Sequence, residues 1–277
     1  MTTTVLNIFP VSSRAGHAVL ACLLLGIVGC SSSSGGGNDG EGLMPLGLND
    51  TGVDWCGNDD NNNLSCPVSE FPGQDGEFGR DALERQGNLL KFGSGDAGFD
   101  FIKLDNDGEE LSASANNHAC VLDNVTGLMW EVKQTGTGDL RYSGHTYSWY
   151  NPDGSVNGGN AGEEDDGTCA GSACDTQAFV AAVNTAELCG YDDWRMPTVS
   201  ELNSIMHRGA TGDVAVDPEF FPNTTADSYW TGQSRATDTA NSAWAITFSV
   251  PEFSNFAIRT LSKEFSTNHV RLVREIP

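Results

Sequence analysis

One short stretch of the chain, residues 189–202, concentrates the residue types that could do chemistry: CGYDDWRMPTVSEL. It holds a thiol, adjacent carboxylates and an arginine beside a tryptophan. Such a set could form a catalytic or ligand-binding cluster, or it could be a turn around which the fold is assembled. The residue types favour the second interpretation. We expect Trp194 to be buried and Arg195 to pair with a carboxylate or with carbonyl groups.

The second half of this stretch predicts the start of a helix. Thr198 and Glu201 have the spacing of a capping box, in which a hydroxyl and a carboxylate bond the first free amides of a helix. Pro197 stands just outside this helix. His207 and Arg208 then fall in its expected last turn, where cations complement the helix dipole.

No recognised catalytic motif occurs elsewhere in the sequence. G-x-S-x-G, H-E-x-x-H, the P-loop and the dinucleotide fingerprint are all missing from it. His118, His145 and His269 have no Cys or Asp partner at a recognised spacing. Catalytic and metal clusters need several convergent partners. The sequence therefore predicts a protein that is not an enzyme.

An acidic turn, LDNDGEEL at residues 104–111, suggests one cofactor, calcium. Asp105, Asp107 and Glu109 alternate around a glycine, and oxygen ligands suit this hard cation. The twelve-residue EF-hand pattern is missing from the sequence. Solvated acidic loops are the favoured alternative, so the sequence establishes no cofactor.

Three aromatic residues beside glycine-rich loops are candidates for contacting a ligand. Tyr147, Trp149 and Tyr150 could stack on sugar rings. Large aromatic side chains also dominate protein cores. Core packing is therefore an equal alternative for Trp149.

The beginning of the sequence is typical of an exported lipoprotein. Residues 1–29 read as a signal peptide, with the apolar run AVLACLLLGIVG at residues 18–29. The following IVGC is similar to the lipobox of bacterial lipoproteins, which implies that Cys30 is acylated and anchors the chain to a membrane. An ordinary secretory signal with an incidental cysteine is the alternative. By resemblance to bacterial sorting rules, Ser31 favours the outer membrane, and residues 30–42 form a flexible Ser/Gly tether.

The cysteines that follow predict a disulfide framework. An even number in an exported chain indicates three disulfides. Proximity in the sequence favours two short loops and leaves one long bridge. A zinc site at Cys169 and Cys174 is disfavoured by their C-x4-C spacing. The proposed pairs are Cys56–Cys66, Cys169–Cys174 and Cys120–Cys189.

Hydrophobic patterning predicts an α+β protein. Residues 99–105 alternate as a strand, residues 121–130 read as a hairpin, and residues 175–188 read as a helix that Asp175 caps. Later strands are expected in SYWTGQS, AWAITFSV, FAIRTL and HVRLVREI. In the last of these, the alternation predicts Val270 and Leu272 inward, with Arg271 and Arg274 outward.

Composition limits the partners. The chain has 277 residues, a net charge of −24, and 14 basic residues against 38 acidic ones. Nucleic acid, anionic lipid and sulfated polysaccharide would be repelled by this charge. Cations and neutral ligands remain compatible with it.

Five ordered motifs carry a family resemblance: CVLDNVTGLMWEVK, CDTQAFVAAVNTAELCGYDDWRMPTVSEL, FFPNTTADSYWTGQS, AWAITFS and HVRLVR. Together they resemble the Lcl C-terminal domain family. The resemblance implies a C-type-lectin-like fold, with two helices packed on a curved antiparallel sheet and long disulfide-stapled loops. It assigns residues 118–277 to that domain and leaves residues 43–117 as a turn-rich segment. The family's namesake is an adhesin that binds sulfated glycans through a basic surface, which we do not expect on this acidic chain.

These observations favour a non-enzymatic lipoprotein of the bacterial envelope, periplasmic or surface-exposed. Its partners would be the membrane, through Cys30, and a glycan or protein ligand that it binds as an adhesion module. The alternative is a structural envelope protein stabilised by calcium. An enzyme is the least favoured class, and the sequence does not predict an oligomeric state.

Overall fold

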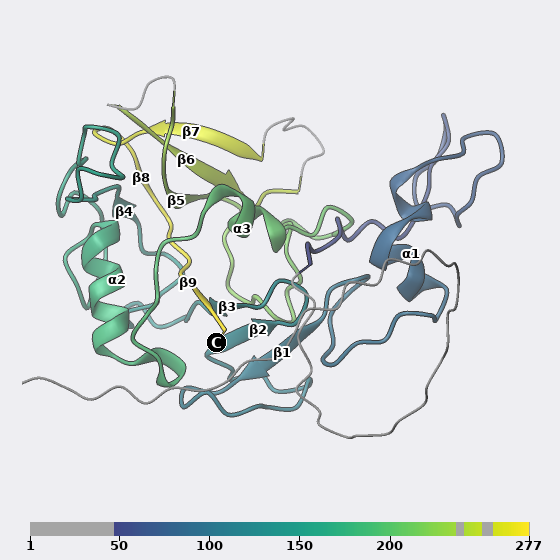
Figure 1. The fold of residues 1–277 in the computed structure, drawn as a ribbon, viewed down its shortest axis with the longest axis horizontal. Coiled ribbons are helices and arrows are strands. Elements are labelled where there is room, and N and C mark those ends of the chain that lie inside the picture. Colours follow the sequence, from purple (N-terminus) through teal and green to yellow (C-terminus); the bar gives the residue numbers. More distant parts are fainter. Residues whose placement is uncertain (1–46, 237–240, 251–256, 277) are drawn as a thin grey trace, which may run out of the picture. The chain divides into compact units, whose positions relative to one another are not determined.

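The computed structural model describes residues 47–236, 241–250 and 257–276 (Figure 1). The predicted signal peptide, Cys30 and the Ser/Gly tether lie outside the described residues. Among the helices in the described part of the chain, none has the length and apolar character needed to cross a membrane.

The first sheet contains strands from both ends of the region that carries the five motifs. Its antiparallel order is β1 (Phe101–Leu104), β2 (Cys120–Asp123), β3 (Leu128–Glu131) and β9 (Val273–Glu275). β2 and β3 form the predicted hairpin, and β9 pairs with β3. β1 comes from the turn-rich segment and pairs along its length with β2, so this segment contributes a strand to the sheet.

Two further antiparallel sheets complete the β structure. One contains β5 (Ser228–Ser234), β6 (Ser242–Thr247) and β7 (Ile258–Ser262), and the other pairs β4 (Tyr147–Ser148) with β8 (Thr267–Asn268). The combination of helices with antiparallel sheets agrees with the predicted α+β class. The expectation of one curved sheet is corrected to three sheets in the described residues.

The helix predicted at residues 175–188 forms, but it is shorter than the periodicity suggests. It is α2 (Thr176–Thr185), and the Asp175 carboxylate caps it by accepting the Ala178 N–H. A separate 3-10 turn, η2 (Leu188–Gly190), follows, with Glu187 in the left-handed region. The left-handed residue breaks the helical hydrogen-bond series that the apolar spacing alone would have continued.

The capping box is confirmed at α3 (Val199–Ser204). The Thr198 hydroxyl accepts the Glu201 N–H, and the Glu201 carboxylate accepts the Thr198 N–H. The prediction of His207 and Arg208 in the last helical turn is wrong, because α3 ends at Ser204. The His207 ring instead contacts the Asp96 carboxylate at 2.8 Å.

The turn-rich segment also contains short helical pieces. These are the 3-10 turn η1 (Asp75–Glu77) and the helix α1 (Gly79–Arg85). The Asp81 carboxylate is buried and accepts the backbone N–H groups of Gly52 and Gly98. This one side chain therefore ties α1 to two loops that are distant in the sequence.

All three disulfides pair as predicted. Cys56–Cys66 and Cys169–Cys174 close short loops, and Cys120–Cys189 spans 69 residues. The long bridge joins the first residue of β2 to η2, and it lies within a buried apolar cluster.

The outward placement predicted for Arg271 and Arg274 is wrong, because both side chains are buried. The Arg271 guanidinium lies 4.8 Å from the centre of the Phe221 ring. That of Arg274 lies 3.6 Å from the Tyr191 ring centre and pairs with Asp193 at 2.5 Å. Alternation predicts an exposed face only where one side of a strand meets water, and here other segments cover both sides.

Candidate functional site

The motif at residues 189–202 is a folding element. Trp194 is 2% exposed, and its indole N–H donates to the Leu188 carbonyl at 3.0 Å. Arg195 makes a bidentate contact with Glu201 at 2.9 and 2.7 Å. The Pro197 carbonyl accepts the Gly232 N–H at 2.8 Å. The motif therefore connects η2, α3 and β5.

The three candidate aromatic residues do not form a stacking platform. Tyr147 and Trp149 are buried, and the Trp149 indole N–H donates to the Thr231 carbonyl at 2.9 Å. Both therefore belong to the core, which is the alternative stated for Trp149, and burial corrects the expectation that Tyr147 is open to a ligand. Tyr150 is partly exposed, and a hydrogen bond with Glu164 raises the pKa of its hydroxyl.

In the acidic turn at residues 104–111, the first carboxylate, Asp105, accepts hydrogen bonds from the backbone of the turn itself. Asp105 Oδ1 accepts the backbone N–H groups of Asp107 and Glu109, each at 2.9 Å. A Cβ atom at Gly108 would lie 2.6 Å from the Cys189 carbonyl oxygen, so the turn packs against η2. Across the described residues, no three His, Cys, Asp or Glu side chains are grouped to hold a metal ion. Calcium binding stays a prediction.

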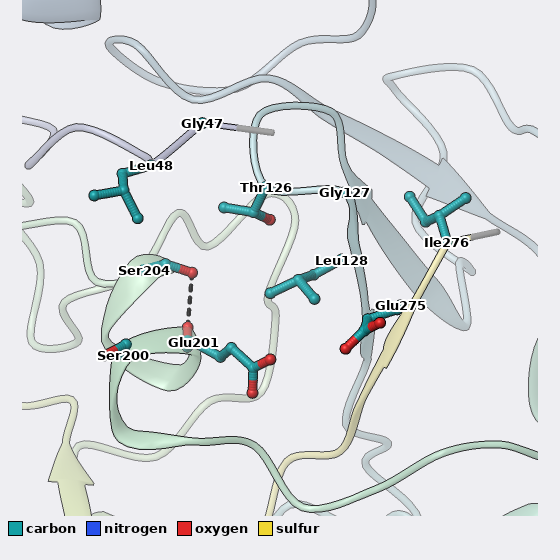
Figure 2. Close-up of a pocket in the computed structure, with 10 residues that line it drawn as sticks. All are labelled: Gly47, Leu48, Thr126, Gly127, Leu128, Ser200, Glu201, Ser204, Glu275 and Ile276. Carbon is teal, nitrogen blue, oxygen red and sulfur yellow. Dashed lines mark hydrogen bonds between the residues drawn. The ribbon is translucent and has the colours of Figure 1, made fainter. Parts of the chain in front are cut away.

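A groove beside α3, shown in Figure 2, has a volume of about 410 Å³. Leu48, Leu128 and Ile276 give it apolar walls, and Glu201 and Glu275 give it carboxylates. Both carboxylates contact the Arg195 guanidinium, at 2.7 and 3.0 Å. Its charged groups therefore serve to hold β9 against α3.

A more polar hollow opens beyond the end of β3. Its volume is about 540 Å³, and a neighbouring hollow of about 200 Å³ shares Asn106, Gln134 and Arg141 with it. We call the pair the amide hollow, because five carboxamide side chains line it: Asn106, Asn116, Asn117, Gln134 and Asn223.

Some asparagines elsewhere in the described chain hold loops in place, and most amides of this hollow do not. Asn124, Asn157 and Asn184 donate to Asp100, to the Asn151 carbonyl and to the Trp194 carbonyl, and so hold loops in place. In the hollow, only Asn223 is tied in this way, to the Lys133 carbonyl at 3.1 Å. The other four amide side chains make no hydrogen bond to any described residue.

Arg141 forms the floor of the hollow. Its guanidinium donates to the carbonyls of Ala119 and Val132. Burial lowers the pKa of Arg141, while Glu131 and Asp139 oppose that shift. Since an arginine stays charged in proteins, it gives this hollow a fixed positive charge.

Two further basic residues lie at the hollow. The Lys133 ammonium contacts Glu131 at 2.8 Å, and burial lowers its pKa to about 8, against the opposing effect of Glu131. Burial also lowers the pKa of His118, whose Nε2 bonds the Phe220 carbonyl at 2.8 Å. The hollow thus combines unbonded amides with the cations of Arg141 and Lys133, and Asp139 adds one carboxylate to its lining. Such a set suits hydroxyl or carboxylate groups.

Sequence reasoning missed this hollow. Its amides come from the turn after β1, the loop before β2, the loop after β3 and the loop before β5. A signal was present in the adjacent Asn116 and Asn117, which precede His118. The other three amides, Asn106, Gln134 and Asn223, are distant in the sequence and come together only in the folded chain.

The comparisons with known proteins agree with the motifs. The family model described as the Lcl C-terminal domain matches residues 119–274, more than half of the chain. The comparisons of this chain with curated proteins and with solved structures found no match.

Proposed function

Because the chain belongs to the Lcl C-terminal domain family, we propose that it is a non-enzymatic binding module whose ligand is a glycan held in the amide hollow. One observation carries this proposal: four amide side chains face a hollow and bond nothing in the described protein. A carboxamide offers two donors and an acceptor. Sugar hydroxyls, which donate and accept, complement such groups.

The charge of the hollow supports a neutral or carboxylate-bearing saccharide. Arg141 and Lys133 lie in a chain whose net charge is −24. A local cationic floor offsets the long-range repulsion that an acidic glycan would meet. No aromatic platform lies in the hollow, so we expect hydrogen bonding to dominate over stacking.

We further propose a C-type-lectin-like fold for the matched domain. Strands from its two ends, β2–β3 and β9, share one sheet. Two helices lie between them, and the Cys120–Cys189 bridge ties the first strand to the turn after α2. These features support the two-helix architecture in which the ends of the domain meet.

The proposed location is the bacterial envelope, with Cys30 lipidated and anchored in the outer membrane. The support is the apolar run ending in IVGC and the Ser/Gly stretch that follows. Labelled palmitate should be incorporated into the wild-type chain in a bacterial host and not into a Cys30→Ala variant. Equal labelling of both chains would contradict the anchor.

A glycan array tests the ligand site. The protein is residues 30–277 with Cys30→Ser, and the hollow variant is Asn116→Ala with Asn117→Ala. Each lost side-chain hydrogen bond contributes about 1 kcal/mol. The variant should therefore bind about tenfold to thirtyfold more weakly to whichever glycan the wild type binds.

The chain provides a matched control in Asn61 and Asn62, an adjacent exposed pair in a loop outside the hollow. The Asn61→Ala, Asn62→Ala variant should bind like the wild type. A wild-type chain that binds no glycan, or a control that loses as much affinity as the hollow variant, refutes the proposed function.

A further inference from the structure

In the segment 90–92, the apolar side chains are exposed and the charged side chain is largely buried. Leu90 and Phe92 are 92% and 78% exposed, whereas the Lys91 side chain between them is only 10% exposed. Two large apolar groups therefore face solvent beside a cation that is turned inward.

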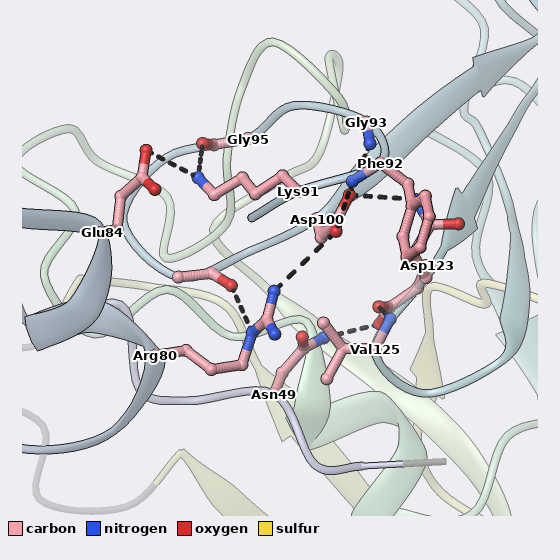
Figure 3. A network of polar contacts seen from close by, with 12 residues as sticks. Asn49, Arg80, Glu84, Lys91, Phe92, Gly93, Gly95, Asp100, Asp123 and Val125 are labelled. Atoms are coloured by element: carbon pink, nitrogen blue, oxygen red, sulfur yellow. Dashed lines mark hydrogen bonds and ion pairs between the residues drawn. The ribbon is translucent and has the colours of Figure 1, made fainter. Parts of the chain in front are cut away.

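An ordered polar network holds this arrangement in place (Figure 3). The inward Lys91 ammonium donates to the carbonyls of Gly95 and Ala97, at 2.9 and 2.6 Å, and pairs with Glu84 at 3.1 Å. These contacts use the donors of the ammonium group. Turning Lys91 outward would break all of them.

The backbone on either side of Phe92 is held as well. The N–H groups of Phe92 and Gly93 donate to the Asp100 carboxylate at 2.9 and 2.7 Å. The same carboxylate accepts the Asn124 amide at 2.9 Å and lies 3.9 Å from Arg80. The outward position of Phe92 is thus built into the fold.

Exposed apolar side chains gather in the same part of the chain. Eight large hydrophobic residues are exposed among the described residues, and five of these lie within residues 48–92. They are Leu48, Phe78, Leu83, Leu90 and Phe92. Leu90 and Phe92 stand two positions apart in the sequence, and neighbouring exposed apolar side chains mark an interaction surface more often than single ones do.

The charge of residues 78–92 and their distance in sequence from Cys30 indicate which partner the exposed Leu90 and Phe92 contact. Residues 78–92 contain three basic and two acidic residues, a net charge of 3 − 2 = +1 in a chain of −24. Between Cys30 and Gly47 the chain advances 47 − 30 = 17 residues. Seventeen residues span at most about 60 Å even when fully extended, so a lipid on Cys30 would keep the described residues within reach of the bilayer.

We propose that Leu90 and Phe92 insert into the surface of a zwitterionic phospholipid bilayer and hold the tethered chain against it. This inference rests on the proposed lipid anchor at Cys30. Apolar side chains at the headgroup boundary add to the affinity of an acyl anchor. Anionic lipid weakens the contact, because the remainder of the molecule is strongly acidic.

Vesicle flotation tests the contact without the anchor. Residues 30–277 with Cys30→Ser are mixed with phosphatidylcholine vesicles at millimolar lipid, and the bound fraction gives a partition coefficient. Adding Leu90→Ser and Phe92→Ser should lower this coefficient at least fivefold. Replacing a third of the lipid with phosphatidylglycerol should lower it for the parent chain.

The matched control changes exposed apolar side chains outside this segment. Val156 and Phe265 are 56% and 85% exposed, and Val156→Ser with Phe265→Ser should leave the partition coefficient unchanged. Both double variants should melt like the parent, because the altered side chains face solvent.

Three results would overturn the proposal. These are a parent chain that does not float, an equal loss in the control, and a dimer in sedimentation velocity that only the Leu90→Ser, Phe92→Ser change dissociates. The last result would assign the surface to a second copy of the chain. Palmitate labelling and glycan binding are measured separately, so failure here is distinguishable from failure of the proposed function.

Discussion

At the residue scale, Trp194 shows how the motif at 189–202 supports the fold. Its indole is buried and bonds the Leu188 carbonyl, while the backbone N–H of Trp194 donates to Asn184 in α2 at 2.8 Å. We expect Trp194→Ala to lower the free energy of unfolding by about 3–5 kcal/mol, as large core deletions do. Urea unfolding measures this loss. An exposed-site change, Phe265→Ala, is the control and should leave stability nearly unchanged.

A second prediction at this scale concerns acid. Burial alone would raise the pKa of Glu201, but hydrogen bonds from Arg195 and Thr198 outweigh it and lower the pKa below its usual value of 4.5. A carboxyl group with a lowered folded-state pKa stabilises the fold above its unfolded pKa and loses this effect as pH falls through the folded value. Glu201→Gln should therefore be less stable than wild type at pH 7.

The stability gap between Glu201→Gln and wild type should narrow below about pH 4, as the wild-type carboxyl becomes protonated. Chemical unfolding at several pH values measures the gap. A gap that is independent of pH would show that Glu201 acts through packing and not through its charge.

Individual residues were predictable where a local rule decides them. The capping box at Thr198 and Glu201 depends only on residues three apart, and the structure confirms it. Arg271 was misplaced because its burial depends on Phe221, Thr224 and Tyr229, which reach it from elsewhere in the chain. No periodicity in HVRLVREI contains that information.

At the element scale, the long disulfide should matter most. In the chain-entropy model, closing 69 residues stabilises by on the order of 4 kcal/mol, whereas closing five residues gives only about 2 kcal/mol. Replacing both Cys120 and Cys189 with serine should therefore lower the melting temperature more than replacing both Cys169 and Cys174. Scanning calorimetry of the two variants gives the order. The reverse order would mean that the short loop carries more of the fold.

Elements were easier to predict than their arrangement. The hairpin, α2, α3 and the later strands follow from patterns within about a dozen residues. Pairing of β9 with β3 joins residues about 145 positions apart, and the division into three sheets depends on such pairings. The amide hollow has the same origin, because Gln134 and Asn223 meet only after the sheets are assembled.

At the scale of the whole molecule, charge opposes compaction. A net charge of −24 makes the folded chain repel itself, and salt weakens this repulsion as the screening length shrinks from about 30 Å at 0.01 M to about 8 Å at 0.15 M. We expect the melting temperature to rise by a few degrees over that range of NaCl. A melting temperature that falls with salt would show that attractive ion pairs, such as Arg274 with Asp193, outweigh the general repulsion.

The same screening argument separates the two functional hypotheses. Asp105 Oδ1 already accepts two amides of its own turn, and solvated acidic loops are the favoured alternative there, so we expect calcium to act on this protein as a divalent screening ion. We therefore expect CaCl2 and MgCl2 at equal concentration to raise the melting temperature equally, and Asp107→Asn with Glu109→Gln to leave both effects in place. A rise specific to calcium that this double variant removes would instead establish a structural site at the acidic turn. That outcome would favour a calcium-stabilised envelope protein over a glycan-binding module.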